Sequence, residues 1–266
     1  MKEPSLAFTD LKNERISVLV PVYNEGNRLI ENLALLESEL KPHFSNYEII
    51  VISDGSTDST NEILSTQNLE HVRSIILEKN HGKGFAIKRG FYEATGQYIL
   101  FIDGGMELHP KEIRVFLGLM LIYDADIVIG SKRHPQSQLY YPIYRRFLSA
   151  GYQSLVKLFF NLDVTDTQVG IKLFRKPVVD AIKEKLSIDK YGFDLELLCL
   201  AQYSGFTKIL EAPVRLDYFD KNIRKGFSEL FHVAKVTWAV LADSIQVYRK
   251  IKKLRRSQKN HVENIA

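Results

Sequence analysis

Carboxylate side chains follow two apolar runs of the sequence, at the point where each run would end as a strand. Asp54 comes directly after the run Tyr47–Ser53, and Asp103 closes the run Gln97–Asp103, with Glu107 four residues later. Two carboxylates on one loop can hold Mg²⁺ or Mn²⁺, which then bridges a diphosphate. On position alone a second interpretation stays open, in which Asp103 caps a turn and Glu107 is solvated. These residues therefore indicate either a metal–diphosphate site or ordinary turns.

Two loops after strands carry groups that suit a nucleotide. In Asp54–Asp58, a carboxylate followed by glycine can meet a base or a ribose, although the segment can also be a strand–turn–helix junction capped by Ser56 or Thr57. The loop Asn80–Gly84 is basic, contains glycine and enters a helix, so its backbone N–H groups suit a phosphate. A plain connecting loop is the alternative.

The elements that must position these loops alternate between strands and helices. Strands are expected over Ile16–Tyr23, Tyr47–Ser53, Val72–Glu78, Gln97–Asp103 and Ala125–Ser131, and helices over Arg28–Leu40, Thr57–Thr66, Gly84–Thr95 and Pro110–Tyr123. Strands that are apolar on both faces predict an α/β fold, with a mostly parallel sheet flanked by helices. Ligands of such sheets lie beyond the carboxyl ends of the strands, so the loops are expected to converge. Neither a dinucleotide glycine motif nor a P-loop follows any strand.

The second half of the chain has a looser pattern. Tyr140–Phe160 has helical spacing, Asp163–Phe174 is rich in turn residues, and Gly192–Tyr203 is expected to be a helix that carries Asp194. A short strand is expected over Ile209–Tyr218.

Length and composition describe a globular chain with a full core. Its 266 residues are 45% hydrophobic and 26% charged, which excludes collagen-like, disordered and small disulfide-rich classes. The single cysteine, Cys199, excludes an internal disulfide, and its apolar neighbours predict a buried, inert thiol. No stretch reaches the roughly 18–20 uninterrupted apolar residues of a membrane span, and the first residues do not resemble a signal peptide. We therefore expect a cytoplasmic protein, free or peripheral on the cytosolic face of a membrane.

The net charge of +4 is concentrated near the C-terminal end, where seven basic and no acidic side chains lie between Arg249 and Lys259. A long helix is predicted over Gly226–Lys253, because apolar residues recur every three or four positions and form one stripe: Phe227, Phe231, Ala234, Trp238, Leu241, Ile245 and Tyr248. We expect one domain over residues 1–225, followed by an amphipathic helix and basic tail over 226–266. The stripe either contacts a membrane interface or packs on the domain.

Four segments, taken with their order, resemble the family 2 glycosyltransferases, which have the GT-A fold. They are Val20–Leu29 (VPVYNEGNRL), Ile52–Thr60 (ISDGSTDST), Asn80–Gly90 (NHGKGFAIKRG) and Phe101–Pro110 (FIDGGMELHP). Three later segments are similar to the branch that makes polyprenyl-phosphate sugars: Gly130–His134 (GSKRH), Asp166–Lys176 (DTQVGIKLFRK) and Tyr191–Ala201 (YGFDLELLCLA). Gly82–Gly84 and the Asp-Thr-Gln-x-Gly segment are closer to dolichyl-phosphate glucosyltransferases than to the mannosyltransferases.

The resemblance implies inverting transfer of a hexose from a nucleotide diphosphate sugar, UDP-glucose-like or GDP-mannose, to a polyprenyl or dolichyl phosphate. A phosphate monoester is already anionic near neutral pH, so it needs cations that align it rather than a general base. The residues implied for the nucleotide sugar are Pro21, Tyr23, Asn24, Glu25, Asp54 on the base, Lys83 and Asp103. Those implied for catalysis are Asp103, the cations Lys132 and Arg133 (with Arg145 and Arg146), and Gln168 and Asp194 on the sugar side. A solvated basic face is the alternative for the cations.

One position departs from the family pattern. Where the family has a second aspartate two residues after the first, this chain has Gly105. Glu107 falls where some relatives place a third metal-facing oxygen, so we expect Mg²⁺ or Mn²⁺ to bind through Asp103 and Glu107. The alternative is a weak or absent metal site.

Two other functions remain open from the sequence. The same fold and donor can serve a soluble glycan or protein acceptor, and Gly105 supports a non-catalytic nucleotide-sugar-binding protein. Nucleic acid is not expected as a partner, because the basic residues are confined to one tail and a few loops.

Overall fold

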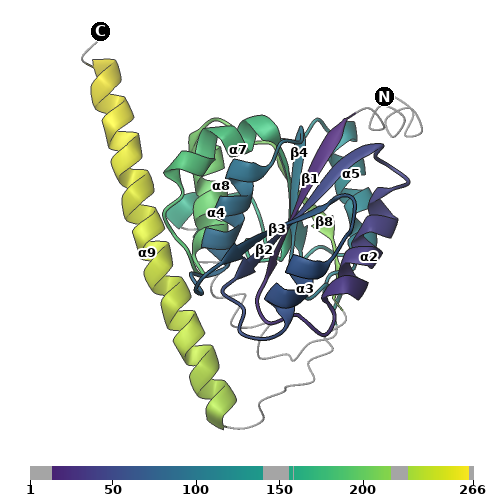
Figure 1. Cartoon of the computed structure of the whole chain (residues 1–266). Helices are drawn as coiled ribbons and strands as arrows, with labels where there is room; N and C mark the ends of the chain where they lie inside the picture. Colours follow the sequence, from purple (N-terminus) through teal and green to yellow (C-terminus); the bar gives the residue numbers. More distant parts are fainter. Residues whose placement is uncertain (1–13, 140–155, 158, 217–226, 264–266) are drawn as a thin grey trace.

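A seven-stranded sheet forms the centre of the computed structural model (Figure 1), which describes residues 14–139, 156–157, 159–216 and 227–263. The strand order is β3-β2-β1-β4-β7-β5-β8. The strands are β1 (Arg15–Val22), β2 (Asn46–Asp54), β3 (Val72–Leu77), β4 (Tyr98–Ile102), β5 (Ile127–Ser131), β7 (Ile171–Arg175) and β8 (Ile209–Pro213). Only the pairs that β7 makes with β4 and β5 are antiparallel. The predicted mostly parallel α/β sheet is therefore confirmed.

Helices cover both faces of this sheet (Figure 1). On one face lie α2 (Leu29–Leu40) and α5 (Ile113–Ile122), and on the other lie α4 (Lys83–Glu93), α7 (Lys176–Ile182) and α8 (Phe193–Tyr203). Each face has its own buried apolar cluster. The smaller elements are α3 (Thr60–Thr66), the 3-10 turns η2 (Pro110–Glu112) and η3 (Lys183–Lys185), and a two-stranded sheet of β6 (Gln138–Leu139) and β9 (Arg215–Leu216).

Two elements differ from the sequence-based expectation. The helix expected from Thr57 begins at Thr60, because the carboxylate of Asp58 accepts hydrogen bonds from the Thr60 and Gly26 amides and Ser56 bonds the loop after β1 instead of capping. The segment Asp163–Phe174, expected to be turn-rich, contains the start of β7, which lies in the middle of the sheet.

A single long helix, α9 (Phe227–Glu263), runs along one side of the molecule (Figure 1) and extends ten residues beyond its predicted end at Lys253. Among its described side chains, Val240, Val247 and Ile251 are apolar and buried, and the helix packs against α8. Within the described parts of the chain, we find no helix that is both long enough and apolar enough to cross a bilayer.

The predicted apolar stripe of α9 is divided between the domain and the exposed surface. Trp238 and Ile245 are 68% and 49% exposed. Tyr248 instead packs edge-on against the rings of Phe159 and Phe160. The side chains of Phe227, Phe231 and Ala234 lie outside the described residues.

Candidate active site

A cavity of about 870 Å³ opens at the carboxyl ends of β1, β2 and β4. β1 lies between β2 and β4, so the loops after these three strands meet at the point where the strand order reverses. Eight of the predicted site residues line the cavity: Pro21, Tyr23, Glu25, Asp54, Lys83, Asp103, Gln168 and Asp194. The predicted convergence of separate segments on one edge of the sheet is therefore observed.

Asp54 fixes the loop that enters α4. Its two carboxylate oxygens accept hydrogen bonds from the amides of His81 (2.8 Å) and Gly82 (2.7 Å). These two amides were expected to suit a phosphate, but Asp54 already occupies them. Gly82 has φ of +111°, and a Cβ there would lie 2.5 Å from the carbonyl oxygen of Asp189, so the tight entry requires glycine. The loop thereby delivers the side chain of Lys83, the next residue, into the cavity.

Lys83 and Asp103 form an ion pair in the cavity, with 2.6 Å between Nζ and Oδ1. Burial alone would lower the pKa of Lys83, but the carboxylates of Asp103, Asp194 and Glu107 outweigh it and raise that pKa. The ammonium group therefore stays charged near neutral pH. It is a cation placed beside the carboxylate that was assigned to the donor diphosphate.

Lys172 is a site residue that the sequence reasoning missed. It lies on β7, its side chain is fully buried, and its ammonium group donates to the Val169 carbonyl (2.9 Å) and to the Asp194 carboxylate. Burial lowers the pKa of Lys172, although Asp194 favours the charged form. Lys83 and Lys172 lie 5.3 and 5.0 Å from the centre of the Phe101 ring, so the two Lys–Asp pairs flank one aromatic side chain.

The residues for a divalent ion supply oxygen donors but no complete cage. A Cβ at Gly105 would lie 3.4 Å from Oε1 of Glu25, so the Glu25 carboxylate lies beside the position of the missing aspartate side chain. Burial, together with Glu107, Asp58 and Asp103, raises the pKa of Glu25. Among the described residues, no three His, Cys, Asp or Glu side chains are grouped to hold an ion. Asp103 and Glu107 remain as two candidate oxygen donors, and Asp103 is also paired with Lys83. An Mg²⁺ ion that arrives with a diphosphate commonly needs only one or two protein carboxylates.

Several predicted residues lie away from the cavity lining. Asn24 joins the loop after β1 to the loop after β2, since its side-chain oxygen accepts a hydrogen bond from the Thr57 amide (2.8 Å). Lys132 follows β5, and its ammonium group is 3.7 Å from a carboxylate oxygen of Asp166. The next residue, Arg133, has an exposed side chain. Glu107 contributes charge but no lining surface, and Arg145 and Arg146 lie outside the described residues. Lys190 and Tyr191 line the cavity without having been predicted.

Known proteins resemble both the sequence and the fold. A dolichyl-phosphate beta-glucosyltransferase of Drosophila melanogaster is 35% identical over 216 residues, which are 75% of this chain and 65% of the relative. Proteins of the same name from Dictyostelium discoideum and Homo sapiens are each 33% identical, over 85% and 76% of this chain and 73% and 67% of their own lengths. The chain thus spans about two thirds to three quarters of these relatives.

A solved structure of glucosyl-3-phosphoglycerate synthase from Mycobacterium tuberculosis, crystallised with Mn²⁺, uridine diphosphate and phosphoglyceric acid, has the same fold. It superposes with a TM-score of 0.68 at 17% identity, over 92% of this chain and 82% of that one. Residues 17–183 match the model of the family described as Glycosyl transferase family 2. The protein is therefore a glycosyltransferase that belongs to family 2 and has the GT-A fold, as its motifs predicted.

Proposed function

We propose that this enzyme transfers glucose from UDP-glucose to a dolichyl or related polyprenyl phosphate, with inversion at the anomeric carbon. The observation that carries the proposal is that the predicted donor residues line the same cavity as Gln168 and Asp194. The chain is also 33–35% identical to enzymes named dolichyl-phosphate beta-glucosyltransferases. The relatives' names support the sugar and the acceptor. The nucleotide of the donor is to be tested, with UDP-glucose compared against GDP-mannose.

The proposed reaction needs charge stabilisation rather than proton abstraction. An oxygen of the acceptor phosphate attacks the anomeric carbon, the bond from that carbon to the diphosphate oxygen breaks, and UDP leaves with the bonding electrons. Lys83 offsets the negative charge that develops on the diphosphate. The Asp194 carboxylate accepts hydrogen bonds from sugar hydroxyls, and the Gln168 amide can donate to them or accept from them. Both side chains thereby orient the sugar ring. A general base is unnecessary, because the attacking phosphate is already ionised.

Asp103 and Glu107 are the residues that would hold Mg²⁺ or Mn²⁺ when the donor binds. The ion would stabilise the leaving diphosphate as a Lewis acid. Pro21, near the end of β1, and Tyr23 and Glu25, on the loop after it, bind the nucleoside side of the donor. The acceptor-phosphate role of Lys132 and Arg133 stays a prediction, and Lys190 is a further cation at the cavity.

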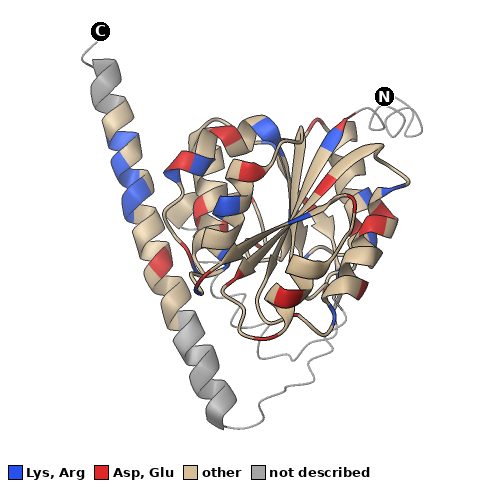
Figure 2. Ribbon diagram, viewed as in Figure 1, with Lys and Arg blue, Asp and Glu red and all other residues tan. Residues whose placement is uncertain are grey.

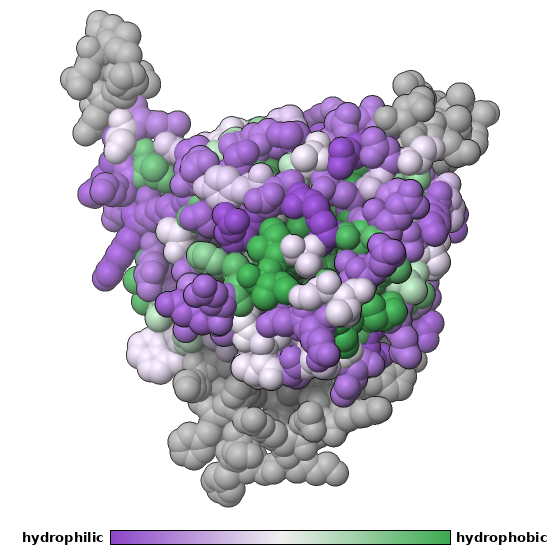
Figure 3. Space-filling view, viewed as in Figure 1, coloured by the Kyte–Doolittle hydropathy of each residue, from purple (hydrophilic) through white to green (hydrophobic). Residues whose placement is uncertain are grey.

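Membrane attachment through α9 is the second part of the proposal. Trp238 and Ile245 expose apolar side chains, and the basic residues Arg249, Lys252, Lys253, Arg255 and Arg256 follow along the same helix (Figure 2). Figure 3 shows mainly hydrophilic side chains along that basic stretch. An apolar face joined to a basic segment is typical of helices that lie in a membrane interface with anionic lipid. We place the enzyme on the cytosolic face of a membrane.

The experiment that tests the function is a transfer assay with radiolabelled UDP-glucose or GDP-mannose and three acceptor conditions. These are dolichyl phosphate, a soluble oligosaccharide, and no acceptor. We expect label in the organic phase only with UDP-glucose and dolichyl phosphate. Label on the oligosaccharide would show that the acceptor is a soluble glycan and not a lipid phosphate. Donor binding without turnover would favour a non-catalytic protein.

A further inference from the structure

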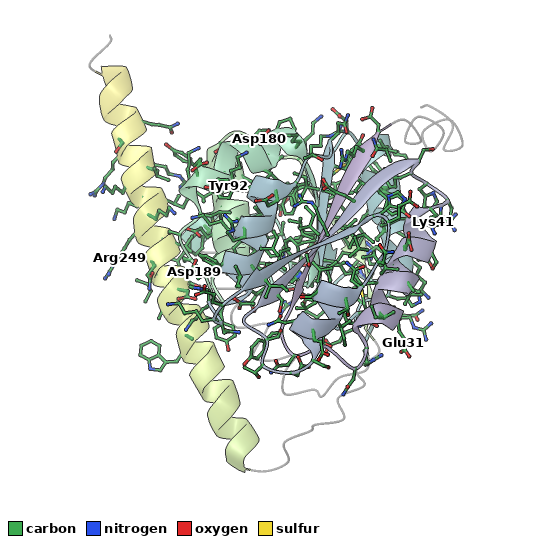
Figure 4. The ribbon with its side chains drawn as sticks, viewed as in Figure 1. Glu31, Lys41, Tyr92, Asp180, Asp189 and Arg249 are labelled. Carbon is green, nitrogen blue, oxygen red and sulfur yellow. The ribbon has the colours of Figure 1, made fainter. Side chains whose placement is uncertain are left out.

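The helix α9 forms one wall of the active-site cavity. Ala239, Val240 and Asp243 line the cavity together with Tyr191, which precedes α8. Figure 4 shows Asp189, on the loop before α8, next to α9, whereas Arg249 points away from the domain. The segment expected to begin a separate membrane helix at residue 226 therefore also contributes to the site.

The first contact between α9 and the site fixes the beginning of α8. A carboxylate oxygen of Asp243 accepts a hydrogen bond of 2.8 Å from the amide of Gly192, the residue that precedes the first turn of α8. This amide has no partner within its own helix, so Asp243 satisfies it from outside. A Cβ at position 192 would lie 2.3 Å from the Cβ of Asp243, so the close approach requires glycine.

The second contact ties the same turn to the loop before it. Lys250 of α9 lies 2.6 Å from Oε1 of Glu196, whose side chain is fully buried. Glu196 also accepts hydrogen bonds of 2.9 Å from the amides of Ser187 and Ile188, which belong to the loop before α8. A buried carboxylate that loses its cationic partner is strongly destabilised, so Lys250 keeps this loop and the first turn together.

Asp194 lies between these two contacts. It is two residues after Gly192 and two before Glu196, lines the cavity, and is only 8% exposed. We propose that Asp243 and Lys250 are positioning residues: through them, α9 sets the place of the Asp194 carboxylate beside the bound donor sugar. The inference rests on the proposed sugar-side role of Asp194. It makes the helix that is proposed to meet the bilayer a structural part of the catalytic site.

The test compares Asp243→Ala and Lys250→Gln with a control on the same helix, Gln246→Ala. The Gln246 side chain is exposed, and no hydrogen bond or ion pair is observed for it among the described residues. The measurements are kcat for glucose transfer, the dissociation constant of UDP-glucose by calorimetry, and hydrogen exchange of the peptide Leu186–Leu197.

We expect kcat to fall roughly 10- to 100-fold in both test variants, while donor affinity changes less than about twofold and exchange of the Leu186–Leu197 amides accelerates. Lys250→Arg should restore most of the rate, since it keeps the ion pair. Gln246→Ala should match the wild type in all three measurements.

Three results would overturn the inference. They are an unchanged kcat despite faster exchange, unchanged exchange, or an equal loss of donor affinity, thermal stability and kcat, which would indicate general unfolding. If the wild-type enzyme makes no glucolipid, the proposed function fails by itself. In that case the test and control variants are compared by their rates of UDP-glucose hydrolysis instead of their rates of glucose transfer.

Discussion

At the residue scale, two lysine–aspartate pairs lie at the active site: Lys83 and Asp103 line the cavity, and the buried Lys172 holds Asp194 from behind the lining. The sequence predicted Lys83, Asp103 and Asp194 as site residues but not Lys172. Asp103 comes at the end of a strand and Lys83 at the start of a helix, and each lies next to a glycine. The sequence therefore predicted both loops as parts of a site. Lys172 was missed because a single lysine inside Ile171–Arg175 breaks the apolar run by which a buried strand is predicted. Its burial becomes understandable only when Asp194, far away in the sequence, is seen beside it.

Replacing Lys172 is expected to destabilise the protein and abolish transfer. Lys172→Met leaves Asp194 without its cation in a buried place, which costs about 3–5 kcal/mol. The double variant Lys172→Met with Asp194→Leu removes both charges, so urea unfolding should show that it recovers much of the lost stability while it stays inactive. Equal stability of Lys172→Met and the wild type would show that the ion pair contributes nothing.

Removing the divalent ion is expected to weaken donor binding. Asp103 and Glu107 lack the usual aspartate between them, so the proposed ion would depend on the donor diphosphate and on both remaining carboxylates. In calorimetry, EDTA should lower the affinity for UDP-glucose at least about tenfold, and Glu107→Gln should reduce the response to added Mn²⁺. Equal affinity and turnover with and without EDTA would contradict the metal assignment.

At the element scale, the loops are positioned by contacts between segments that no local pattern reveals. The glycine loop before α4 was expected to bind phosphate through its amides, yet Asp54 accepts from two of them. The start of α3 moved for a similar reason, because Asp58 rather than Ser56 bonds the first turn. Sequence periodicity predicted the parallel strands and most helices, since these depend on local apolar spacing. It could not predict which polar groups in neighbouring loops become partners.

Gly82→Ala is expected to damage donor binding through the position of Lys83. The new methyl group would meet the Asp189 carbonyl at 2.5 Å in a backbone conformation that only glycine adopts easily. Gly205→Ala is the matched control, because Gly205 also has a positive φ, of +95°, but nothing lies within 4 Å of its Cβ position. We expect both variants to lose about 1 kcal/mol of stability from backbone strain, and only Gly82→Ala to lose affinity for UDP-glucose in calorimetry. Equal donor affinity in the two variants would contradict this.

At the scale of the whole molecule, the excess of basic side chains lies on one element, the helix α9. The excess of +4 gathers on α9, where one face packs on α8, another exposes Trp238 and Ile245, and the basic residues continue the helix (Figure 2). Sequence periodicity predicted the helix and its apolar stripe but assigned no second apolar face. That face, formed by Val240, Val247 and Ile251, became evident only from packing against the domain.

Neutralising the basic segment is expected to reduce binding to anionic vesicles. The variant with Lys252, Lys253, Arg255 and Arg256 changed to Gln should lose about 1 kcal/mol per residue of attraction, which sedimentation with phosphatidylserine vesicles can measure. Neutral phosphatidylcholine vesicles serve as the control lipid. Trp238, the single tryptophan, should shift its fluorescence to shorter wavelength when the wild type binds. Unchanged sedimentation of the variant and unchanged fluorescence of the wild type would remove α9 from the membrane contact.

The proposed acceptor, a polyprenyl phosphate, is tested most directly by one comparison of two lipids. Radiolabelled UDP-glucose is incubated with the wild-type enzyme and either dolichyl phosphate or dolichol, which lacks the phosphate, and label in the organic phase is counted. We predict a labelled glucolipid with dolichyl phosphate and none with dolichol, because the ionised phosphate is the nucleophile. Equal labelling of both lipids, or no lipid product while a soluble acceptor is glucosylated, would contradict it.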